Sequence, residues 1–441
     1  MNASPGKLDH YFDITKRGSS LRIEVLAGIS TFASLAYIVV VHPSIMAQAG
    51  FDKSAVFLAT VGVSALFTIC MGLWARLPFA LAPGLEMDGY VAFFVVGVLH
   101  FSLEQALGIV FWSTTVFFLL SILGIRQKII DDIPDGMKYA LSTTIGAFVA
   151  LIGFKLAGIV TFNGDAPSGL GSFTSPQAVA LYIGLGAIII CEAVKLRGSL
   201  LVGIIVSALY CAISGLSVDI KPVEWSSQMF SLIWRFDASV ILDPRSWAPI
   251  LVLFIIDFYG SVAKIIGLTV DTNLFDTKTR QPLNTTQGLY VDGFAALVSP
   301  MMGSSSVTTF VVSRVGIQVG GRTGITAIVC GVLLLLTFFL APLLKFVPVV
   351  ATSGALVMVG WWLLPKKVIR DRFATVDWII AIGMAFMAVM FFSLERAMLL
   401  GYFGYLVHIV LWKKQKPSVY LVVSFLLLVV GFGIGFFGRF G

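Results

Sequence analysis

Two carboxylates lie in a part of the chain that is otherwise almost free of charge. In the stretch LAPGLEMDGYVAFFVVG, residues 81–97, Glu86 and Asp88 follow a Pro-Gly break and precede an apolar run. A carboxylate at the centre of a bilayer costs about 2.5–3.5 kcal/mol on insertion scales, so such residues usually face a cavity, pair with a cation or hold a proton. The two acids therefore indicate a polar site, unless both only line a water-filled vestibule.

A second acid lies in an apolar run together with a base. In LVLFIIDFYGSVAKIIGLTVD, residues 251–271, Asp257 and Lys264 are separated by seven positions. On a helix this spacing places them on nearly the same face, about 10 Å apart along the axis. A buried acid and base on one face indicate a binding or coupling surface. The alternative is a structural ion pair with neighbouring helices.

The stretch MMGSSSVTT, residues 301–309, interrupts another apolar region with short polar side chains. Irregular backbone inside lipid is tolerated only where it is buried or lines a cavity. We expect this stretch to meet APGLEMDG, residues 82–89, near the membrane midplane, unless its residues only form turns and caps. The helices that follow would direct their N-terminal N–H groups at the same point. The hydroxyl groups belong to Ser304, Ser305, Ser306, Thr308 and Thr309.

The composition indicates which elements position these residues. Of the 441 residues, 58% are hydrophobic and 12% are charged, whereas soluble domains carry about 25% charged residues. Apolar runs that approach the roughly 20 residues of a membrane span recur through the chain. We therefore predict an all-α polytopic membrane protein. The sequence contains no H-E-x-x-H, Gly-x-Ser-x-Gly or Walker A motif, so we expect neither an enzyme nor a self-contained ATP-driven pump.

The remaining cysteine, histidine and charge signals favour no cofactor. No cysteine is in a C-x-x-C pair, and we expect no disulfide and no metal. His42, which precedes Pro43, is interpreted as a capping or packing residue rather than a proton relay. The net charge of +7 is interpreted as a sign of membrane orientation rather than of nucleic-acid binding. The cysteines are Cys70, Cys191, Cys211 and Cys330.

Helical segments are expected in two series of seven, separated by an extracellular loop at 217–246. This gives about 14 transmembrane helices, with an additional apolar segment at 419–437 that could add one more. The first series lies near 24–45, 54–74, 85–99, 103–123, 138–160, 177–195 and 199–216. The second series lies near 247–268, 286–299, 307–318, 322–342, 349–363, 374–393 and 396–412.

The distribution of Lys and Arg predicts the orientation of these segments. With the N-terminus in the cytoplasm, 21 of the 30 Lys and Arg residues fall on the cytoplasmic side, seven fall outside, and two lie within apolar runs. This bias satisfies the positive-inside rule. We therefore expect an integral plasma-membrane protein, in the inner membrane if the source is bacterial, with a cytoplasmic N-terminus.

The two series resemble each other at their third segments. The first of these opens with LPFALAPGLEMDG and the second with VSPMMGSSSVTT, and both openings mix Pro, Gly and small or polar residues. Interrupted segments at matching positions in two halves are the sequence sign of an inverted-repeat transporter. We therefore expect repeats at 1–216 and 247–412, the second running in the opposite direction.

Longer stretches of the chain resemble the xanthine/uracil permease family, and most closely its adenine/guanine/hypoxanthine branch. The similarity is ordered along nearly the whole chain. It implies a seven-plus-seven inverted repeat, short strands that open the third and tenth helices, and proton-coupled uptake of a nucleobase by what is often a homodimer. The stretches are RIEVLAGISTFASLAYIVVVHPSI (22–45), LAPG and GYVAFFVV (81–96), GSFTSP (171–176) and GGRTGITAIVCGVLLLLTFFLAPLLKFVPVVATSGALVMVG (320–360).

The resemblance also implies two domains. We expect core helices at 24–123 and 247–342, and gate helices at 138–216 and 349–412. We further expect the gate to be the more uniformly apolar domain, with the polar site residues gathered in the core.

The polar site departs from the family pattern. The purine branch usually has Asn-Ala-Tyr where this chain has Asp88, Gly89 and Tyr90, and Gly where it has Glu86. The eighth helix usually reads Asp-x-x-Asp-Thr, but here only Asp257 remains. The tenth helix usually carries Glu where this chain has Val312. The family scaffold is therefore expected with a rewritten site.

We expect a secondary active transporter for a purine-like nucleobase or a similar small planar solute. Glu86 and Asp257 are the candidate proton-coupling residues, because a carboxylate in an apolar site can hold a proton. A permease for a small cationic or zwitterionic metabolite and a non-transporting sensor or channel are the alternatives. The candidate substrate-binding residues are Glu86, Asp88, Asp257, Lys264, Ser304, Ser305, Ser306 and Thr308.

Overall fold

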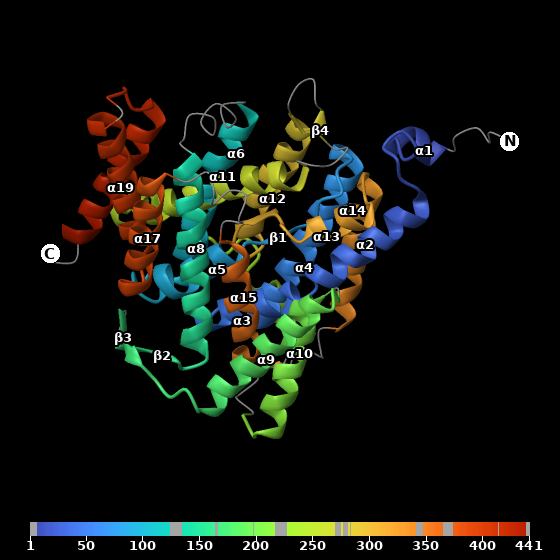
Figure 1. Cartoon of the computed structure of the whole chain (residues 1–441), viewed down its shortest axis with the longest axis horizontal. Helices are drawn as coiled ribbons and strands as arrows, with labels where there is room; N and C mark the ends of the chain where they lie inside the picture. The colour runs from blue at the N-terminus through green and yellow to red at the C-terminus, as the bar shows by residue number, and fades with distance from the viewer. Residues whose placement is uncertain are drawn as a thin grey trace.

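The computed structural model describes residues 7–123, 135–163, 166–196, 198–216, 227–269, 275–276, 281–282, 284–340, 347–364, 374–412 and 414–437. Within these ranges the side chains of a few helical residues, Lys264 among them, are outside the description. The part of the chain that the structure describes is mostly helical, and the ribbon in Figure 1 places both termini at the periphery.

The first half of the chain forms helices and three short strands. They are α1 (Lys7–Phe12), α2 (Leu21–Leu35), α3 (Ile38–Gln48), α4 (Lys53–Cys70), π-helix η1 (Met71–Ala75), β1 (Leu81–Pro83), α5 (Leu85–Gly89), π-helix η2 (Tyr90–Val96), α6 (Leu103–Ile122), α8 (Asp135–Leu156), β2 (Val160–Asn163), β3 (Ala166–Leu170), α9 (Pro176–Ala193) and α10 (Ser199–Ile213). The described part of the predicted polar loop forms the short 3₁₀ helices η3 (Ser227–Phe230), η4 (Ala238–Leu242) and η5 (Pro244–Ser246).

The second half repeats this pattern of helices interrupted by short strands. It contains α11 (Trp247–Thr269), β4 (Phe275–Asp276), β5 (Gln281–Pro282), α12 (Thr285–Met301), β6 (Val307–Thr309), α13 (Ser313–Val319), α14 (Gly324–Leu336), η7 (Val349–Thr352), α15 (Ser353–Trp362), α17 (Thr375–Met390), α18 (Leu394–Val407), π-helix η8 (His408–Trp412) and α19 (Val419–Phe437).

Three of the predicted spans are interrupted in the structure. The first divides into α2 and α3 at Ala36 and Tyr37. The third opens as β1, which ends at the Pro83-Gly84 break, and continues as α5 and η2. The tenth opens as β6 and continues as α13. His42 and Pro43 lie inside α3, so the interpretation of His42 as a helix-capping residue is wrong.

The two interrupted segments meet through their strands. β1 pairs with β6 in antiparallel register, with Leu81 opposite Thr309 and Pro83 opposite Val307. All six strand residues are buried. Figure 1 shows β1 near the middle of the molecule, among α4, α5 and α13. Because an unpaired strand edge in lipid leaves backbone groups without partners, the two short strands satisfy each other at the point where both helices are broken.

Side chains of neighbouring helices fix the ends of this strand pair. The hydroxyl of Thr68 on α4 accepts a hydrogen bond from Leu81 N at 2.9 Å, and Ser313 Oγ accepts one from Ala80 N at 2.9 Å. Ser299 Oγ on α12 accepts one from Val307 N at 3.0 Å. A buried N–H without a partner would cost about 1–3 kcal/mol, so these hydroxyls stabilise the junction.

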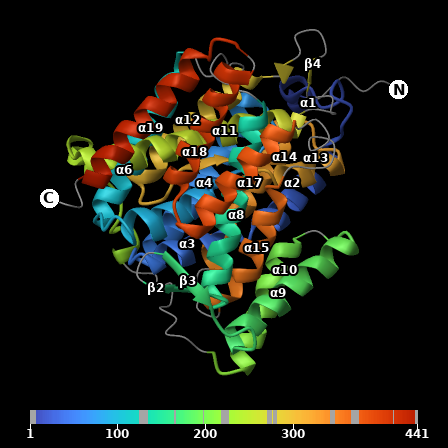
Figure 2. The ribbon, with the colours of Figure 1, turned by 60° about the vertical axis from the view of Figure 1, so that its left-hand side comes forward.

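The helices pack in two sets. In one set, α2 and α4 contact α14, α3 contacts α4, and α6 contacts both α11 and α12. In the other, α8 contacts α15 and α17, α9 contacts α10 and α15, and α18 contacts α17 and α19. Contacts between the sets include α5 with α8 and α11 with α18 and α19. In Figure 2, α9 and α10 project at one end, away from α1 and the N-terminus.

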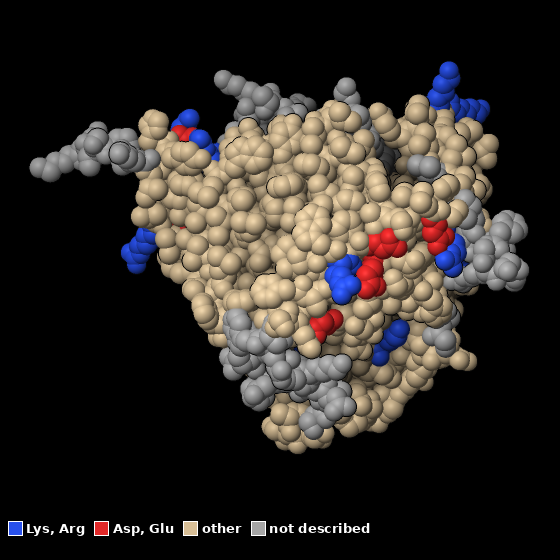
Figure 3. Space-filling model, turned by 180° about the vertical axis from the view of Figure 1, so that it is seen from behind, with Lys and Arg blue, Asp and Glu red and all other residues tan. Residues whose placement is uncertain are grey.

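The outer surface suits a lipid environment. Large apolar side chains are exposed on several helices, among them Ile190 on α9, Ile382 on α17 and Phe403 on α18. Figure 3 shows a broad face on which most described atoms belong to uncharged residues. Among the described residues, six helices are long and apolar enough to cross a membrane. They cover Leu21–Gln48, Lys53–Ala75, Leu103–Ile122, Tyr139–Leu156, Pro176–Ala193 and Leu394–Trp412.

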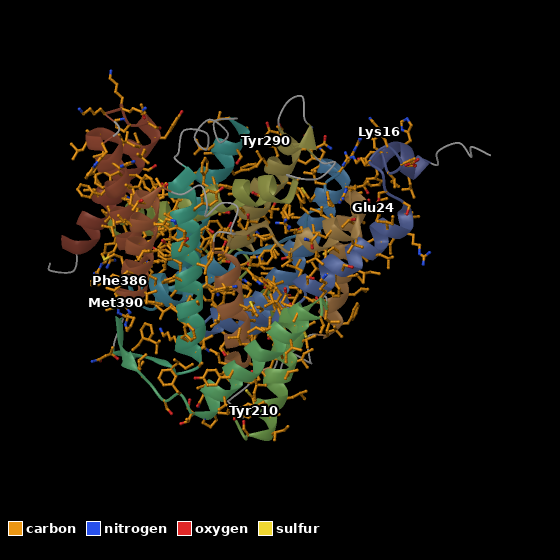
Figure 4. All side chains as sticks on the ribbon, viewed as in Figure 1. Lys16, Glu24, Tyr210, Tyr290, Phe386 and Met390 are labelled. Carbon is orange, nitrogen blue, oxygen red and sulfur yellow. The ribbon has the colours of Figure 1, made fainter. Side chains whose placement is uncertain are left out.

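A buried acid joins the ends of two helices near α1. Glu24, in the first turn of α2, accepts hydrogen bonds from Arg322 N at 2.9 Å, Thr323 N at 3.2 Å and Thr326 Oγ1 at 2.6 Å. These donors lie at the start of α14, where N–H groups lack helical partners. Glu24 therefore caps α14 from another helix. Figure 4 places it on the same side of the molecule as Lys16 and far from Tyr210 on α10.

Candidate functional site

Asp88 belongs to a buried ring of four polar side chains that contact one another. Its Oδ2 lies 2.8 Å from His42 Nδ1, and its Oδ1 accepts a hydrogen bond from Ser305 Oγ. His42 Nε2 lies 3.0 Å from Ser304 Oγ, which closes the ring through the Ser304–Ser305 backbone. All four side chains are buried. The ring joins α3, α5 and the loop that leads into β6.

Asp257 binds the next serine of the same loop. Ser306 Oγ donates a hydrogen bond to Asp257 Oδ2, and both side chains are buried. Adjacent serines therefore hold two acids from separate helices, Asp88 on α5 and Asp257 on α11. The loop is thus tied to two helices immediately before β6 begins.

Glu86 is buried beside its own loop. Its exposed fraction is 8%, and its carboxylate lies so close to Gly84 that a Cβ there would lie 3.2 Å from Glu86 Oε1. Glu86 and Asp88 both act electrostatically on the buried phenol of Tyr37, which precedes α3. The carboxylate therefore lies at the Pro-Gly break, next to the ring around Asp88.

Asp292 on α12 holds β6 from the other side. Its Oδ1 accepts hydrogen bonds from Thr309 N at 2.7 Å, Thr309 Oγ1 at 2.9 Å and Thr308 Oγ1 at 3.2 Å. Asp292 has no exposed surface. Thr308 was predicted to bind substrate, but its hydroxyl binds Asp292 rather than Asp88 or Asp257. A single acid therefore fixes both threonines of the strand.

Comparisons with known proteins identify the scaffold. The family model of the xanthine/uracil permeases, a permease family, matches residues 22–364 of this chain. The chain belongs to this permease family. It is 31% identical over 436 residues to the adenine permease AdeP of Escherichia coli K12, covering 97% of this chain and 96% of that protein. It is 33% identical over 410 residues to the guanine/hypoxanthine permease GhxP of Escherichia coli O157:H7, covering 90% of each chain.

A solved structure shows the same fold. The transmembrane domain of the cyanobacterial bicarbonate transporter BicA aligns with a TM-score of 0.62 at 15% identity, covering 93% of this chain and 97% of that one. Sequence identity this low supports a shared fold only. Together with the family match, it makes this protein a helical membrane permease and not an enzyme, as the sequence predicted.

A further buried acid of the permease lies away from the strand junction. Tyr90, the first residue of η2, donates a hydrogen bond to Glu395 Oε1 on α18 at 2.7 Å, and both side chains are buried. The rings of Phe93, three residues after Tyr90, and of Phe392, three residues before Glu395, lie 6.5 Å apart. Two matching contacts therefore dock η2 against the start of α18.

Lys155 at the end of α8 lies against the same contact. Its Nζ is 4.8 Å from the ring centroid of Phe93, 4.3 Å from that of Phe162 and 5.0 Å from that of Phe392. The structure provides an aromatic environment for its ammonium group, where cation–π attraction contributes about 0.5–2 kcal/mol.

The structure brings together most of the predicted site residues. Asp88, Asp257 and the three serines meet at the strand junction, with Glu86 beside them. Lys264 lies on α11, but its side chain is outside the described part of the structure. The described residues contain no cluster of His, Cys, Asp and Glu that could hold a metal ion.

Three buried polar residues escaped the sequence interpretation. Asp292 was the easiest to find, because it is an acid within the apolar segment TTQGLYVDGFAALVSP. Glu395 precedes the predicted start of its segment and was assigned to a loop. His42 was judged as a lone histidine, and no local signal pairs it with Asp88. The permease therefore has a larger buried polar network than its sequence indicates.

Proposed function

We propose that this permease is a secondary active transporter that takes up a purine-like nucleobase by alternating access. One observation carries the proposal: Asp88 and Asp257, two buried acids from different helices, meet adjacent serines where the two interrupted segments join. Carboxylates accept hydrogen bonds, and a purine base offers ring and exocyclic N–H donors. The adenine and guanine/hypoxanthine permeases among its relatives supply the substrate class.

The proposal includes the architecture that such transport needs. We assign a seven-plus-seven inverted repeat, with core helices at 24–123 and 247–342 and gate helices at 138–216 and 349–412. The two sets of packed helices support this division. The strand pair β1–β6 then lies in the core, at the matching position of both repeats, where inverted-repeat transporters place their sites. The assembly is proposed to be a homodimer with cytoplasmic N-termini.

Proton coupling is the third part of the proposal. Glu86 and Asp257 are its candidate carriers, because desolvation of a carboxylate in an apolar site favours the protonated form. Binding a proton would also lower the charge of a site that must move within the membrane. The burial of both acids supports this assignment.

Uptake in cells that lack their own purine permeases tests the substrate class. Cells that express this permease should accumulate radiolabelled adenine, guanine or hypoxanthine above the level of empty-vector cells, and an excess of the unlabelled base should abolish the signal. Asp88→Ala should reduce uptake at least tenfold, whereas Asp9→Ala on the N-terminal segment should not. Absence of uptake of all three bases by the unmodified protein would refute the nucleobase assignment.

A cationic or zwitterionic metabolite is the second candidate substrate. Three buried acids, Glu86, Asp88 and Asp257, gather at or beside the junction, and acidic sites attract cations. A thermal-shift screen of the purified protein separates the candidates. Stabilisation by nucleobases supports the first, and stabilisation by small cations alone supports the second. Binding of a nucleobase without any uptake would instead favour a sensor or channel on the same scaffold.

A further inference from the structure

We propose that His42 binds the proton that is coupled to transport. We further propose that the charge of His42 determines whether the Ser304 hydroxyl donates or accepts a hydrogen bond. This inference rests on the proposed transport function, but it moves the coupled proton from the candidate acids Glu86 and Asp257 to a histidine that the sequence interpretation assigned to capping or packing. It follows from the ring of His42, Asp88, Ser305 and Ser304. Histidine is the side chain whose charge changes between about pH 5 and 8.

The hydrogen-bond geometry links the charge of His42 to the orientation of one hydroxyl. His42 Nδ1 lies 2.8 Å from Asp88 Oδ2 in an ion-pair contact, so the proton of a neutral imidazole belongs on Nδ1, facing the carboxylate. In neutral histidine the other ring nitrogen is an acceptor, and Ser304 Oγ–H at 3.0 Å donates to it. When Nε2 is protonated it becomes a donor, so Ser304 must accept. The proton of the Ser304 hydroxyl is then free to turn toward another acceptor.

The electrostatics of the ring favour a bound proton during movement. With neutral His42, the ionised Asp88 leaves a negative charge in a fully buried place. A proton on His42 converts this into a close ion pair, which is less costly to hold in an apolar environment than a lone charge. The proton-bound form is therefore the better one for a core that moves through the bilayer.

His42 is the only basic residue among the described side chains of α3, α5, η2, β1 and η7. α5 presents Glu86 and Asp88, η2 presents the phenol of Tyr90, and Tyr37 precedes α3 itself. β1 and η7 also contact α3 but contain no titratable side chain. The remaining neighbour, α4, has its titratable side chains at its ends, at Lys53 and Cys70. Asp88, whose Oδ2 lies 2.8 Å from Nδ1, would attract a positive charge on the imidazole.

The position of Ser304 connects this charge to the substrate site. Ser304 begins the run that contains Ser305 and Ser306, which bind Asp88 and Asp257. A change in the hydroxyl of Ser304 thus occurs next to both acids. Proton binding at His42 would add one hydrogen-bond donor, or remove one acceptor, at the point where the substrate is proposed to bind. This change would couple the binding of the proton to the binding of the nucleobase.

A single-histidine protein tests whether His42 binds the proton. The chain contains four histidines, so the variant His10→Gln/His100→Gln/His408→Gln retains only His42. Its ¹⁵N imidazole signals are recorded in nanodiscs from pH 5 to 8, with and without adenine. We expect the fraction of charged imidazole at a given pH to increase with adenine. If the imidazole of His42 stays neutral from pH 5 to 8, the inference is overturned. It is also overturned if adenine binds but does not change the pH at which His42 becomes charged.

A transport experiment tests whether that proton is coupled. In proteoliposomes with an imposed gradient of one pH unit, the proton concentration differs about tenfold across the membrane. Coupling of one proton therefore allows about tenfold accumulation of adenine at steady state. His42→Gln should reduce the final ratio to about one, and His408→Gln, outside the ring, should keep the wild-type ratio. Gradient-driven accumulation by His42→Gln would overturn the inference. So would a result in which Glu86→Gln loses this accumulation and His42→Gln keeps it.

The two proposals fail in different ways. If the unmodified permease neither binds nor accumulates adenine, guanine or hypoxanthine, the nucleobase assignment is wrong. The titration of His42 can still be measured in that case, and the absence of any charged form down to pH 5 would overturn the proton site independently. Should His42→Gln not fold, the single-histidine protein decides, because it leaves His42 and its three partners unchanged.

Discussion

The hydroxyl of Tyr90 donates a hydrogen bond of 2.7 Å to the carboxylate of Glu395, and this bond joins η2 to α18 inside the molecule. In the proposed division, η2 belongs to the core and α18 to the gate. The bond therefore crosses the boundary along which alternating access requires movement. Its carboxylate comes from a residue that the sequence interpretation placed outside a helix.

Removal of this bond should weaken the contact between the two sets of helices. Tyr90→Phe deletes the donor and leaves a buried carboxylate without it, which costs about 1–3 kcal/mol. We expect a lower thermal unfolding temperature in detergent and a change in the rate of uptake. Tyr182→Phe is the matched control, because Tyr182 is exposed on α9. An unfolding temperature equal to that of the unmodified protein would show that the bond does not stabilise this state.

Asp292 should be necessary for the strand junction. Asp292→Ala removes the acceptor of Thr309 N and of both threonine hydroxyls, at about 1.5–3 kcal/mol for each hydrogen bond to the charged group. We expect large losses of both folded protein and uptake. Asp13→Asn removes an exposed carboxylate 4.0 Å from Lys16, and such surface pairs contribute about 0–1 kcal/mol. Equal stability of the two variants, measured by thermal unfolding, would contradict the role of Asp292.

The close approach of η1 and α14 should tolerate no added methyl group. A Cβ at Gly324 would overlap with the backbone carbonyl of Gly72. Gly324→Ala must therefore separate the two elements, and we expect it to lower the yield of folded protein. Gly62 in α4 has open space around the same position, so Gly62→Ala should stabilise the helix by about 0.5–1 kcal/mol. Size-exclusion profiles and unfolding temperatures of the two variants check this contrast.

Glu86→Gln tests the acid that the sequence favoured as the proton carrier. If Glu86 carries the coupled proton, the variant should lose accumulation driven by a pH gradient in proteoliposomes, because glutamine cannot take up a proton in that range. Full gradient-driven accumulation would exclude Glu86 as the carrier. Asp257→Asn in the same preparation would then show whether the remaining candidate acid is required.

The sequence alone determined the class of protein and the places where its helices break. Apolar runs predict membrane helices because burying backbone in lipid requires long apolar segments. Pro83 and Gly84 predict the interruption of the third span, because proline cannot donate to a helix or strand ladder and glycine accepts most backbone angles. These are local effects, and they also predicted that Asp88, Asp257 and the serines of residues 304–306 would belong to one region.

Only the tertiary structure decided which of these groups meet. Ser305 and Asp88 are 217 positions apart, and Ser304 and His42 are 262 apart. No local propensity encodes such partners, because their distance depends on how α3, α5 and β6 pack. The same reason explains why Thr308 binds Asp292 instead of the site acids, and why His42, unremarkable beside Pro43 in the sequence, is buried against Asp88 in the folded permease.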